Sequence, residues 1–282
     1  MRIKLAKHIG FCAGVRRAVS ITEKTLKVSR TQVFSLGSII HNAQVMHRLQ
    51  TEGLIQVDSP AKVPAGSVLI LPSHGSPQHI RVRAKERRIT LIDVMCPYVA
   101  SVHAICSRIR KDGMRVVIIG DKDHPEVRAL VDLAPDAFLI SDSSNIKQNF
   151  FSGDDVGVIS QTTQSREKFF ALVGEILEKN PQVRSIHIYN TICLDTSCRQ
   201  EEVKELAGSV DCLLVIGSRT SANTNRLYNI GRRINRKTYL VESAESEIFA
   251  KISKHQSVGI ISGASAPDWL VKQIIKKLKG TA

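Results

Sequence analysis

Short runs of β-branched and other apolar residues alternate with helix-like patterns almost without a break along the chain. Several of these runs are apolar at every position, among them residues 68–71, 116–119 and 213–216. Strands that are covered on both faces have this composition, which favours parallel sheets flanked by helices. The sequence predicts strands over residues 2–8, 33–37, 67–72, 90–94, 115–120, 137–141, 156–160, 185–189, 211–217, 238–241 and 257–262.

The segments between these strands repeat apolar residues with the 3.6-residue spacing of a helix. Val15, Val19 and Leu26 fall on one face of the first such segment, and Val102 and Ile109 fall on one face of a later one. Alternating strands and helices predict an α/β protein, and no linker or low-complexity segment interrupts the alternation.

Polar loops follow most of the predicted strands. In open parallel sheets, ligands bind outside the carboxyl ends of the strands, so functional side chains are expected in these loops. The loops are residues 38–42, 73–77, 95–97, 120–126, 161–163, 190–193, 217–223 and 263–267, together with residues 10–12 after the first strand.

The loops recur as a series of two polar loops followed by a cysteine, which predicts three similar αβα units with mostly parallel sheets. The predicted units are 14–96, 97–193 and 194–282, and the last is completed by the N-terminal strand in residues 1–13. A pseudo-threefold arrangement would bring Cys12, Cys96 and Cys193 to one centre. Any α/β chain of this size shows some such rhythm, so the chemistry of the loops must decide between the two interpretations.

The composition is that of an ordinary soluble globular protein, with 43% apolar and 23% charged residues. No apolar run approaches the ~18 residues that a membrane span needs. The N-terminal residues also lack the apolar core of a secretory signal. These features predict a cytoplasmic protein, and in a reducing cytosol thiols more often bind metal or do chemistry than form disulfides.

The six cysteines differ in their surroundings. Cys106 lies on an apolar helix stripe and Cys212 begins a buried strand, so both are predicted core thiols. Cys12, Cys96 and Cys193 each follow a strand near a helix start, where the helix dipole and main-chain N–H groups favour a thiolate. The chain has no C-x-x-C pair, which argues against a zinc ribbon or finger. Three thiolates from three units suit an iron–sulfur cluster with one iron left open for substrate.

Polar side chains suited to binding an anion occupy equivalent strand-end loops. Imidazole and hydroxyl donors next to glycines and helix starts make good diphosphate sites. Neither G-x-x-x-x-G-K-[ST] nor G-x-G-x-x-G occurs, so a nucleotide is not the obvious ligand. The candidates are His41, His74, His124, Ser221, Asn223 and Ser265.

A carboxylic acid and a hydroxyl complete the candidate chemistry. In His124-Pro125-Glu126 a carboxyl group lies close to an imidazole, and Glu126 is suited to general acid catalysis if a dry site raises its pKa. Thr162 offers a hydroxyl that can relay a proton. An H-x-E pattern also suggests metal-dependent hydrolysis, but the helical H-E-x-x-H motif is absent.

These motifs follow one another in a recognisable order. They are Gly10-Phe11-Cys12-Ala13-Gly14-Val15, His41-Asn42, Ser73-His74-Gly75, Asp93 with Cys96-Pro97, His124-Pro125-Glu126-Val127, Gln161-Thr162-Thr163, Asn190-Thr191-Ile192-Cys193, Arg199-Gln200 and Gly263-Ala264-Ser265-Ala266-Pro267. The set resembles 4-hydroxy-3-methylbut-2-enyl diphosphate reductases, the LytB/IspH family. The resemblance runs from residue 10 to about residue 270, and such an ordered set is far more specific than any single motif.

The resemblance implies the last step of the methylerythritol phosphate route to isoprenoids, in which 4-hydroxy-3-methylbut-2-enyl diphosphate is reductively dehydroxylated to isopentenyl and dimethylallyl diphosphates. It also implies three α/β units around a [4Fe–4S] cluster held by Cys12, Cys96 and Cys193, with the substrate's allylic hydroxyl on the open iron. Glu126 would deliver protons, helped by Thr162 as a catalytic and substrate-binding residue. The diphosphate would be bound by His41, His74, His124, Ser221, Asn223 and Ser265.

The chain departs from the family pattern at several positions. Ala222 stands where the family usually has a second serine, and residues 194–198 differ from the family's usual sequence after the last cysteine. None of these differences removes a cysteine, a loop histidine or the acid, so the activity is expected to be kept. The altered surroundings of Cys96 and Cys193 motivate a second hypothesis, a divergent paralogue with the same cluster scaffold that reduces or senses another ligand. Cys198 is an alternative cluster ligand, but its position in a helical run favours a bystander role.

The chain is strongly basic, with 40 Lys and Arg against 26 Asp and Glu, a formal net charge of +14. A nucleic-acid-binding protein is one interpretation, but the basic residues are scattered and no aromatic residues are interleaved with them as stacking platforms. Positive potential would instead attract a diphosphate and an acidic electron donor of the ferredoxin or flavodoxin type. No nucleic-acid partner is expected, and the chain is expected to be a monomer or homodimer.

Overall fold

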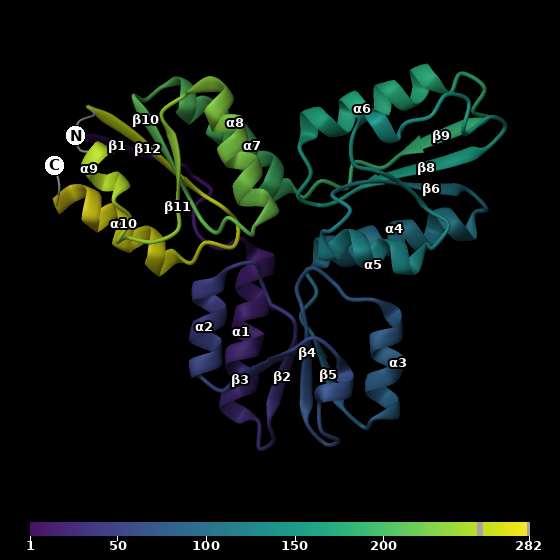
Figure 1. Cartoon of the computed structure of the whole chain (residues 1–282), viewed down its shortest axis with the longest axis horizontal. Helices are drawn as coiled ribbons and strands as arrows, with labels where there is room; N and C mark the ends of the chain where they lie inside the picture. The colour runs from purple at the N-terminus through teal and green to yellow at the C-terminus, as the bar shows by residue number, and fades with distance from the viewer. Residues whose placement is uncertain (253–255, 281–282) are drawn as a thin grey trace. The chain divides into compact units, whose positions relative to one another are not determined.

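The computed structural model describes residues 1–252 and 256–280, which form three four-stranded parallel sheets with helices beside them (Figure 1). The strands are β1 (Arg2–Leu5), β2 (Val33–Leu36), β3 (Leu54–Val57), β4 (Val68–Leu71), β5 (Thr90–Asp93), β6 (Arg115–Ile119), β7 (Phe138–Ile140), β8 (Asp155–Ser160), β9 (Ser185–Ile188), β10 (Cys212–Ile216), β11 (Thr238–Val241) and β12 (Ser257–Ser262). The predicted fold class, three α/β units with parallel sheets, is confirmed.

All three sheets have the same strand order. The orders are β3-β2-β4-β5, β7-β6-β8-β9 and β11-β10-β12-β1. In the first two sheets the second strand in sequence lies at one edge, and the third strand lies on the other side of the first. In the third sheet β10, β11 and β12 follow the same path, and the N-terminal strand β1 takes the place of the fourth strand. The connections that follow the two central strands therefore run to opposite sides of the sheet, and this creates a topological switch point between the two strands.

Two differences from the predicted strands have physical causes. The predicted strand 2–8 ends at Leu5, because the His8 N–H donates to Glu202 Oε2 (3.0 Å) instead of continuing the ladder with β12. The edge strand β3 was not predicted. It has four residues, of which only Leu54 is buried, so its apolar pattern is weak.

The helices are α1 (Ala13–Val28), α2 (Ala43–Thr51), α3 (Gln78–Glu86), α4 (Pro97–Lys111), α5 (Pro125–Leu133), α6 (Arg166–Lys179), α7 (Leu194–Gly208), α8 (Ala222–Ile234), α9 (Ile248–Ile252) and α10 (Asp268–Gly280), with short 3₁₀ turns η1 (Pro60–Lys62) and η2 (Ser143–Asn145). Pro97 and Pro125 occupy first-turn positions, where the missing N–H costs nothing. Within the described residues, every helix is too short or too polar to cross a bilayer.

Central strands are buried on both faces, as their apolar runs predict. In β10, Leu214 and Ile216 belong to the core that contains Ile274 of α10. Leu213 belongs to the opposite core, which contains Leu227 of α8. Burial of a leucine or isoleucine side chain contributes roughly 1.5–3 kcal/mol, so these strands are the best-anchored parts of each sheet.

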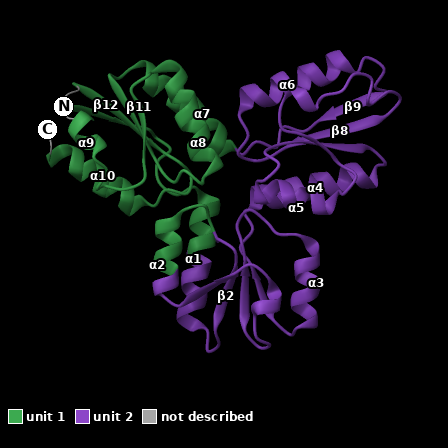
Figure 2. Cartoon of the chain, in the orientation of Figure 1, with its two compact units in different colours: residues 1–19, 40–49, 194–282 green, residues 20–39, 50–193 purple. Residues whose placement is uncertain are grey.

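The chain divides into two compact units (Figure 2). Residues 1–19, 40–49 and 194–282 contain the sheet formed by β1 and β10–β12, and residues 20–39 and 50–193 contain the other two sheets. The boundaries 14–96, 97–193 and 194–282 with 1–13 stay a prediction. Of the third predicted unit, residues 253–255 and 281–282 lie outside the described residues.

Candidate functional site

The predicted site residues follow the central strands of the three sheets. In each sheet the two central strands are parallel neighbours, so their carboxyl ends lie at the same edge. His41 and His74 follow β2 and β4; His124, Glu126 and Thr162 follow β6 and β8; and Ser221, Asn223 and Ser265 follow β10 and β12. The topology therefore provides three polar edges at three switch points, one in each sheet.

Each candidate cysteine is attached to its sheet in the same way. The Cys12 N–H donates to the Ala264 carbonyl (3.0 Å) in the loop after β12. Equivalent bonds join the N–H of Cys96 to the Ser73 carbonyl (2.8 Å) and the N–H of Cys193 to the Thr162 carbonyl (2.9 Å). In all three cases the acceptor is the second residue after a central strand, which supports a true internal repeat over a general α/β rhythm.

The two predicted catalytic residues are in direct contact. Thr162 donates its main-chain N–H to Glu126 Oε1 (2.7 Å) and its hydroxyl to Glu126 Oε2 (2.7 Å). Glu126 is 1% exposed and Thr162 is 5% exposed. Burial raises the pKa of Glu126 to about 7, although the two hydrogen bonds from Thr162 act in the opposite direction. The carboxyl group is therefore suited to give up and regain a proton near neutral pH.

His124 caps the helix that begins with this acid. Its Nδ1 accepts from the Glu126 N–H (3.3 Å), and Pro125 occupies the first helical turn of α5. Because Nδ1 is the acceptor, a neutral His124 ring carries its proton on Nε2. The capping contact thus prepares an N–H donor of the kind that an anionic ligand needs.

Two loops of the first compact unit are joined at His41. Ser265 Oγ donates to the His41 carbonyl (3.1 Å), and Asn42 Nδ2 donates to the Ser265 carbonyl (3.0 Å). Asn42 Oδ1 also accepts from the Val45 N–H (3.1 Å) at the start of α2. Burial lowers the pKa of His41 and so favours its neutral form. Asn42 is part of the His41-Asn42 motif, but its capping role was not predicted. The signal was present, because an asparagine directly before a helix is a typical N-cap.

Asn223 is the clearest sign of a ligand site in this unit. It lies in the first turn of α8, after Ser221, whose hydroxyl accepts from the Thr224 N–H (3.3 Å). Asn223 is 3% exposed, and within the described residues neither its amide oxygen nor its amide nitrogen has a hydrogen-bond partner. An unpaired buried amide costs roughly 1–3 kcal/mol, and a bound polar ligand would remove this cost.

His74 lies in a loop that His103 supports. Gly75 adopts a φ of +87°, and a Cβ atom there would lie 3.3 Å from His103 Nε2, so the imidazole packs directly against the loop. Burial lowers the pKa of His103, and nearby Arg81 adds to this effect. Its buried Nε2 has no hydrogen-bond partner among the described residues. No role was predicted for His103, because a single histidine on an apolar helix belongs to no recognisable motif.

The cysteines differ in burial as predicted. Cys106 and Cys212 are fully buried, and burial raises the pKa of their thiols to about 11 and about 12, which confirms them as core thiols. Cys12, Cys96 and Cys193 are half-buried at the starts of α1, α4 and α7, and the Val15 N–H donates to Cys12 Sγ (3.4 Å). None of the six is in a disulfide bond.

The three half-buried cysteines are divided between the compact units. Cys12 belongs to one unit, and Cys96 and Cys193 belong to the other. Across residues 1–252 and 256–280, no group of three or more His, Cys, Asp and Glu side chains is gathered as for a metal ion. Their role as ligands therefore stays a prediction that depends on the chemistry of the thiols and their equivalent positions.

Comparisons with known proteins agree along nearly the whole chain. A family model described as LytB protein matches residues 3–279. The chain is 37% identical over 284 residues to the 4-hydroxy-3-methylbut-2-enyl diphosphate reductase of Aquifex aeolicus, covering 98% of this chain and 96% of the relative. It is 36% identical over 281 residues to the protein of the same name from Citrifermentans bemidjiense, covering 99% and 97%.

Solved structures are similar as well. The E-1-hydroxy-2-methyl-but-2-enyl-4-diphosphate reductase of Plasmodium falciparum matches with a TM-score of 0.92 at 26% identity, covering 98% of this chain and 87% of that one. A structure of (E)-4-hydroxy-3-methyl-but-2-enyl diphosphate reductase, described as the terminal enzyme of the non-mevalonate pathway, matches with a TM-score of 0.74 at 36% identity. It covers 99% of this chain and 100% of that one.

Replacing Glu126 by glutamine should change how stability depends on pH. In the folded chain the pKa of Glu126 is about 7, whereas in the unfolded chain it has the ordinary value of 4.5. Between these two pH values only the folded chain keeps the proton. The free energy of unfolding therefore falls by about 3 kcal/mol as the pH rises through this window, and it stays at the lower level above it. Glu126→Gln should remove this fall in urea unfolding measured from pH 4 to 8, while the exposed Glu201→Gln should retain it. Identical pH profiles for wild type and Glu126→Gln would contradict the assignment.

Proposed function

The chain belongs to the LytB protein family, and we propose that it acts as a 4-hydroxy-3-methylbut-2-enyl diphosphate reductase. The reaction removes the allylic hydroxyl as water, consumes two electrons and two protons, and yields isopentenyl and dimethylallyl diphosphates. The observation that carries the proposal is the buried contact between Glu126 and Thr162 at a switch point of a chain that shares 37% identity with such a reductase.

Glu126 is the proposed proton donor to the departing hydroxyl. Its burial keeps the proton available near neutral pH, because its pKa is raised to about 7. The Thr162 hydroxyl, 2.7 Å from Oε2, is placed to pass a proton between the carboxyl group and the substrate oxygen. The main-chain N–H of Thr162 fixes the other carboxyl oxygen and so orients the acid.

Imidazole, hydroxyl and amide groups are proposed to bind the diphosphate. Asn223 supports this role most directly, because its amide is buried and neither polar atom has a hydrogen-bond partner among the described residues. His124 supports it through the ring proton that its capping bond places on Nε2. The proposed substrate-binding residues are His41, His74, His124, Thr162, Ser221, Asn223 and Ser265.

A [4Fe–4S] cluster fits the three half-buried cysteines. Cys12, Cys96 and Cys193 stand at helix starts, outside disulfide bonds, with their main-chain N–H groups already bonded to neighbouring loops. Thiolates are the preferred protein ligands of such clusters. When bound by three cysteines, the cluster would supply electrons and a Lewis-acidic iron at its open position.

Serine substitutions test the ligand assignment. We expect Cys12→Ser, Cys96→Ser and Cys193→Ser each to lose most of the iron and sulfide found in anaerobically purified protein, because a hydroxyl is a poor cluster ligand. Cys198→Ser, on α7, should retain wild-type content. The assignment fails if Cys198→Ser loses the cluster while any of the first three keeps it.

Replacing Asn223 by leucine should separate binding from stability. We expect the KM for the substrate to rise about tenfold or more, because a donor to the diphosphate is lost, while thermal stability is unchanged or increased. The matched control is Asn180→Leu, because the Asn180 side chain accepts from the Phe151 N–H and donates to the Ile176 carbonyl. This control should lower the melting temperature. A wild-type KM in Asn223→Leu would contradict the proposed role.

An acidic electron carrier, of the ferredoxin or flavodoxin type, is the proposed electron donor, as the net charge of +14 suggests. Electrostatic steering weakens as salt screens charges, with a Debye length of about 8 Å at 0.15 M. Turnover driven by such a carrier should therefore fall steeply with added salt, whereas turnover driven by a small neutral reductant should not. Equal salt dependence in the two assays would argue against a charge-steered donor.

A further inference from the structure

The loop that carries Cys12 is fixed at every backbone polar group. The N–H groups of Gly10, Phe11 and Cys12 donate to Ser262 Oγ (2.8 Å), Asp268 Oδ1 (3.3 Å) and the Ala264 carbonyl (3.0 Å), respectively. The Gly10 carbonyl accepts from Arg199 Nη2 (3.0 Å). The Phe11 carbonyl accepts from Arg16 Nη2 (3.3 Å), and the Cys12 carbonyl accepts from the main-chain N–H of Arg16 (2.9 Å). Two arginines thus donate to all three carbonyls of the loop, while Ser262, Asp268 and Ala264 accept from its three N–H groups.

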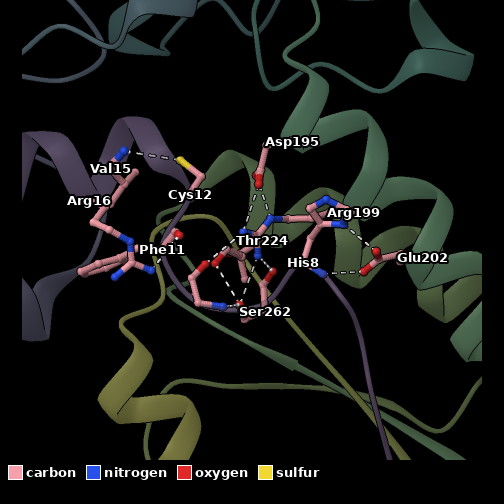
Figure 3. A network of polar contacts seen from close by, with 12 residues as sticks. His8, Phe11, Cys12, Val15, Arg16, Asp195, Arg199, Glu202, Thr224 and Ser262 are labelled. Atoms are coloured by element: carbon pink, nitrogen blue, oxygen red, sulfur yellow. Dashed lines mark hydrogen bonds and ion pairs between the residues drawn. The ribbon is translucent and has the colours of Figure 1, made fainter.

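Arg199 is the buried member of this pair of arginines. Figure 3 shows both arginines with their polar contacts. Arg199 is 1% exposed, and each of its five N–H groups has an acceptor. Nη1 donates to the carbonyl and the hydroxyl of Ser262 (2.8 and 3.3 Å), while Nη2 donates to the Gly10 carbonyl. The guanidinium therefore bridges the end of β12 and the Cys12 loop.

Asp195 neutralises this buried charge. Its carboxylate accepts from Nε (2.7 Å) and Nη2 (3.2 Å) of Arg199, in a two-pronged contact across one turn of α7. A buried guanidinium without a counter-ion is strongly destabilising, so the carboxylate is needed to keep Arg199 in place. Planar two-pronged pairing also fixes the rotation of the guanidinium, which a lysine cannot reproduce.

Arg16 and Asp268 form the exposed counterpart. Arg16 Nη1 donates to Asp268 Oδ2 (2.8 Å), and the two side chains are 55% and 43% exposed. Water and salt screen such a pair, so it contributes little to holding the loop. Gly10, with a φ of +79°, passes so close to Asp268 that a Cβ atom would lie 2.0 Å from Oδ1. Since the Arg16–Asp268 pair is exposed, the loop conformation depends chiefly on the buried pair of Arg199 and Asp195.

We propose that Arg199, held by Asp195, is the positioning residue for Cys12: it fixes the Gly10-Phe11-Cys12 loop in the conformation that presents the thiol to the cluster. This inference rests on the proposed role of Cys12 as a ligand. Arg199 does not touch the reacting atoms; it acts through the Gly10 carbonyl and through Ser262, whose hydroxyl in turn accepts from the Gly10 N–H.

Hydrogen exchange of the full-length, anaerobically purified chain tests the proposal. In Arg199→Met, the amides of residues 10–12 should exchange about tenfold faster or more, because charge-assisted bonds to the loop and β12 are lost. Amides of β6, in the other compact unit, should exchange as in wild type. Asp195→Asn should give an intermediate increase, and Arg199→Lys should not restore protection. Arg16→Met, the matched exposed variant, should change exchange less than about threefold.

A cluster readout separates this proposal from the ligand assignment. Cys12→Ser should lose the cluster yet keep the loop protected, since the main-chain bonds remain. Arg199→Met should exchange faster than Cys12→Ser and should bind the cluster with altered midpoint potential or reduced iron content.

Unchanged exchange at residues 10–12 in Arg199→Met overturns the proposal, whereas a retained cluster in Cys12→Ser overturns the ligand assignment alone. If Arg199→Met does not fold, Arg199→Lys and Asp195→Asn decide, and wild-type protection in both overturns the proposal.

Discussion

The chemistry of this chain depends on the parallel pairing of two buried strands at the centre of each sheet. β2 with β4, β6 with β8 and β10 with β12 end at the same edge, and the chain leaves each pair in opposite directions. Such an edge accepts polar loops without interrupting the apolar core. The apolar side chains that anchor the strands thereby decide where the polar ones lie, and the same solution is used three times.

Buried polar groups beside these edges are treated in three different ways. The pKa of the Glu126 carboxyl is raised to about 7 by burial, and the Arg199 guanidinium is neutralised by Asp195. The Asn223 amide has no hydrogen-bond partner in the part of the chain that the structure describes. The arrangements at Glu126 and Asn223 lower the stability of the folded chain and are typical of groups that act on a ligand. The donors of Arg199 are all paired, so this residue serves to hold a loop in place.

Much of the fold could be predicted from local patterns, because the central strands are apolar throughout and polar loops follow them. The strand β3 could not, since Ile55 is partly exposed and Gln56 breaks an already short apolar run. The resemblance assigned Glu126 and Thr162 to proton delivery, but their direct contact was not predicted, because 36 residues separate them. Arg199-Gln200 was one of the motifs of the resemblance, but its contact with the Cys12 loop could not be predicted, because Arg199 and Gly10 are 189 residues apart in the sequence.

The equivalent main-chain bonds of the three cysteines attach each thiol to the end of a central strand. Each cysteine N–H is bonded to a loop carbonyl just after a central strand, so the position of the thiol is coupled to that loop. At Thr162 this coupling reaches the acid, because the residue accepts from the Cys193 N–H through its carbonyl and donates to Glu126 through its N–H and hydroxyl. The two side chains at positions where the sequence departs from the family pattern therefore differ in their effect. Ala222 contributes no side-chain hydrogen bond, whereas Asp195 acts on the Cys12 loop through Arg199, so the Cys12 loop is the one whose conformation depends on the residue type at such a position.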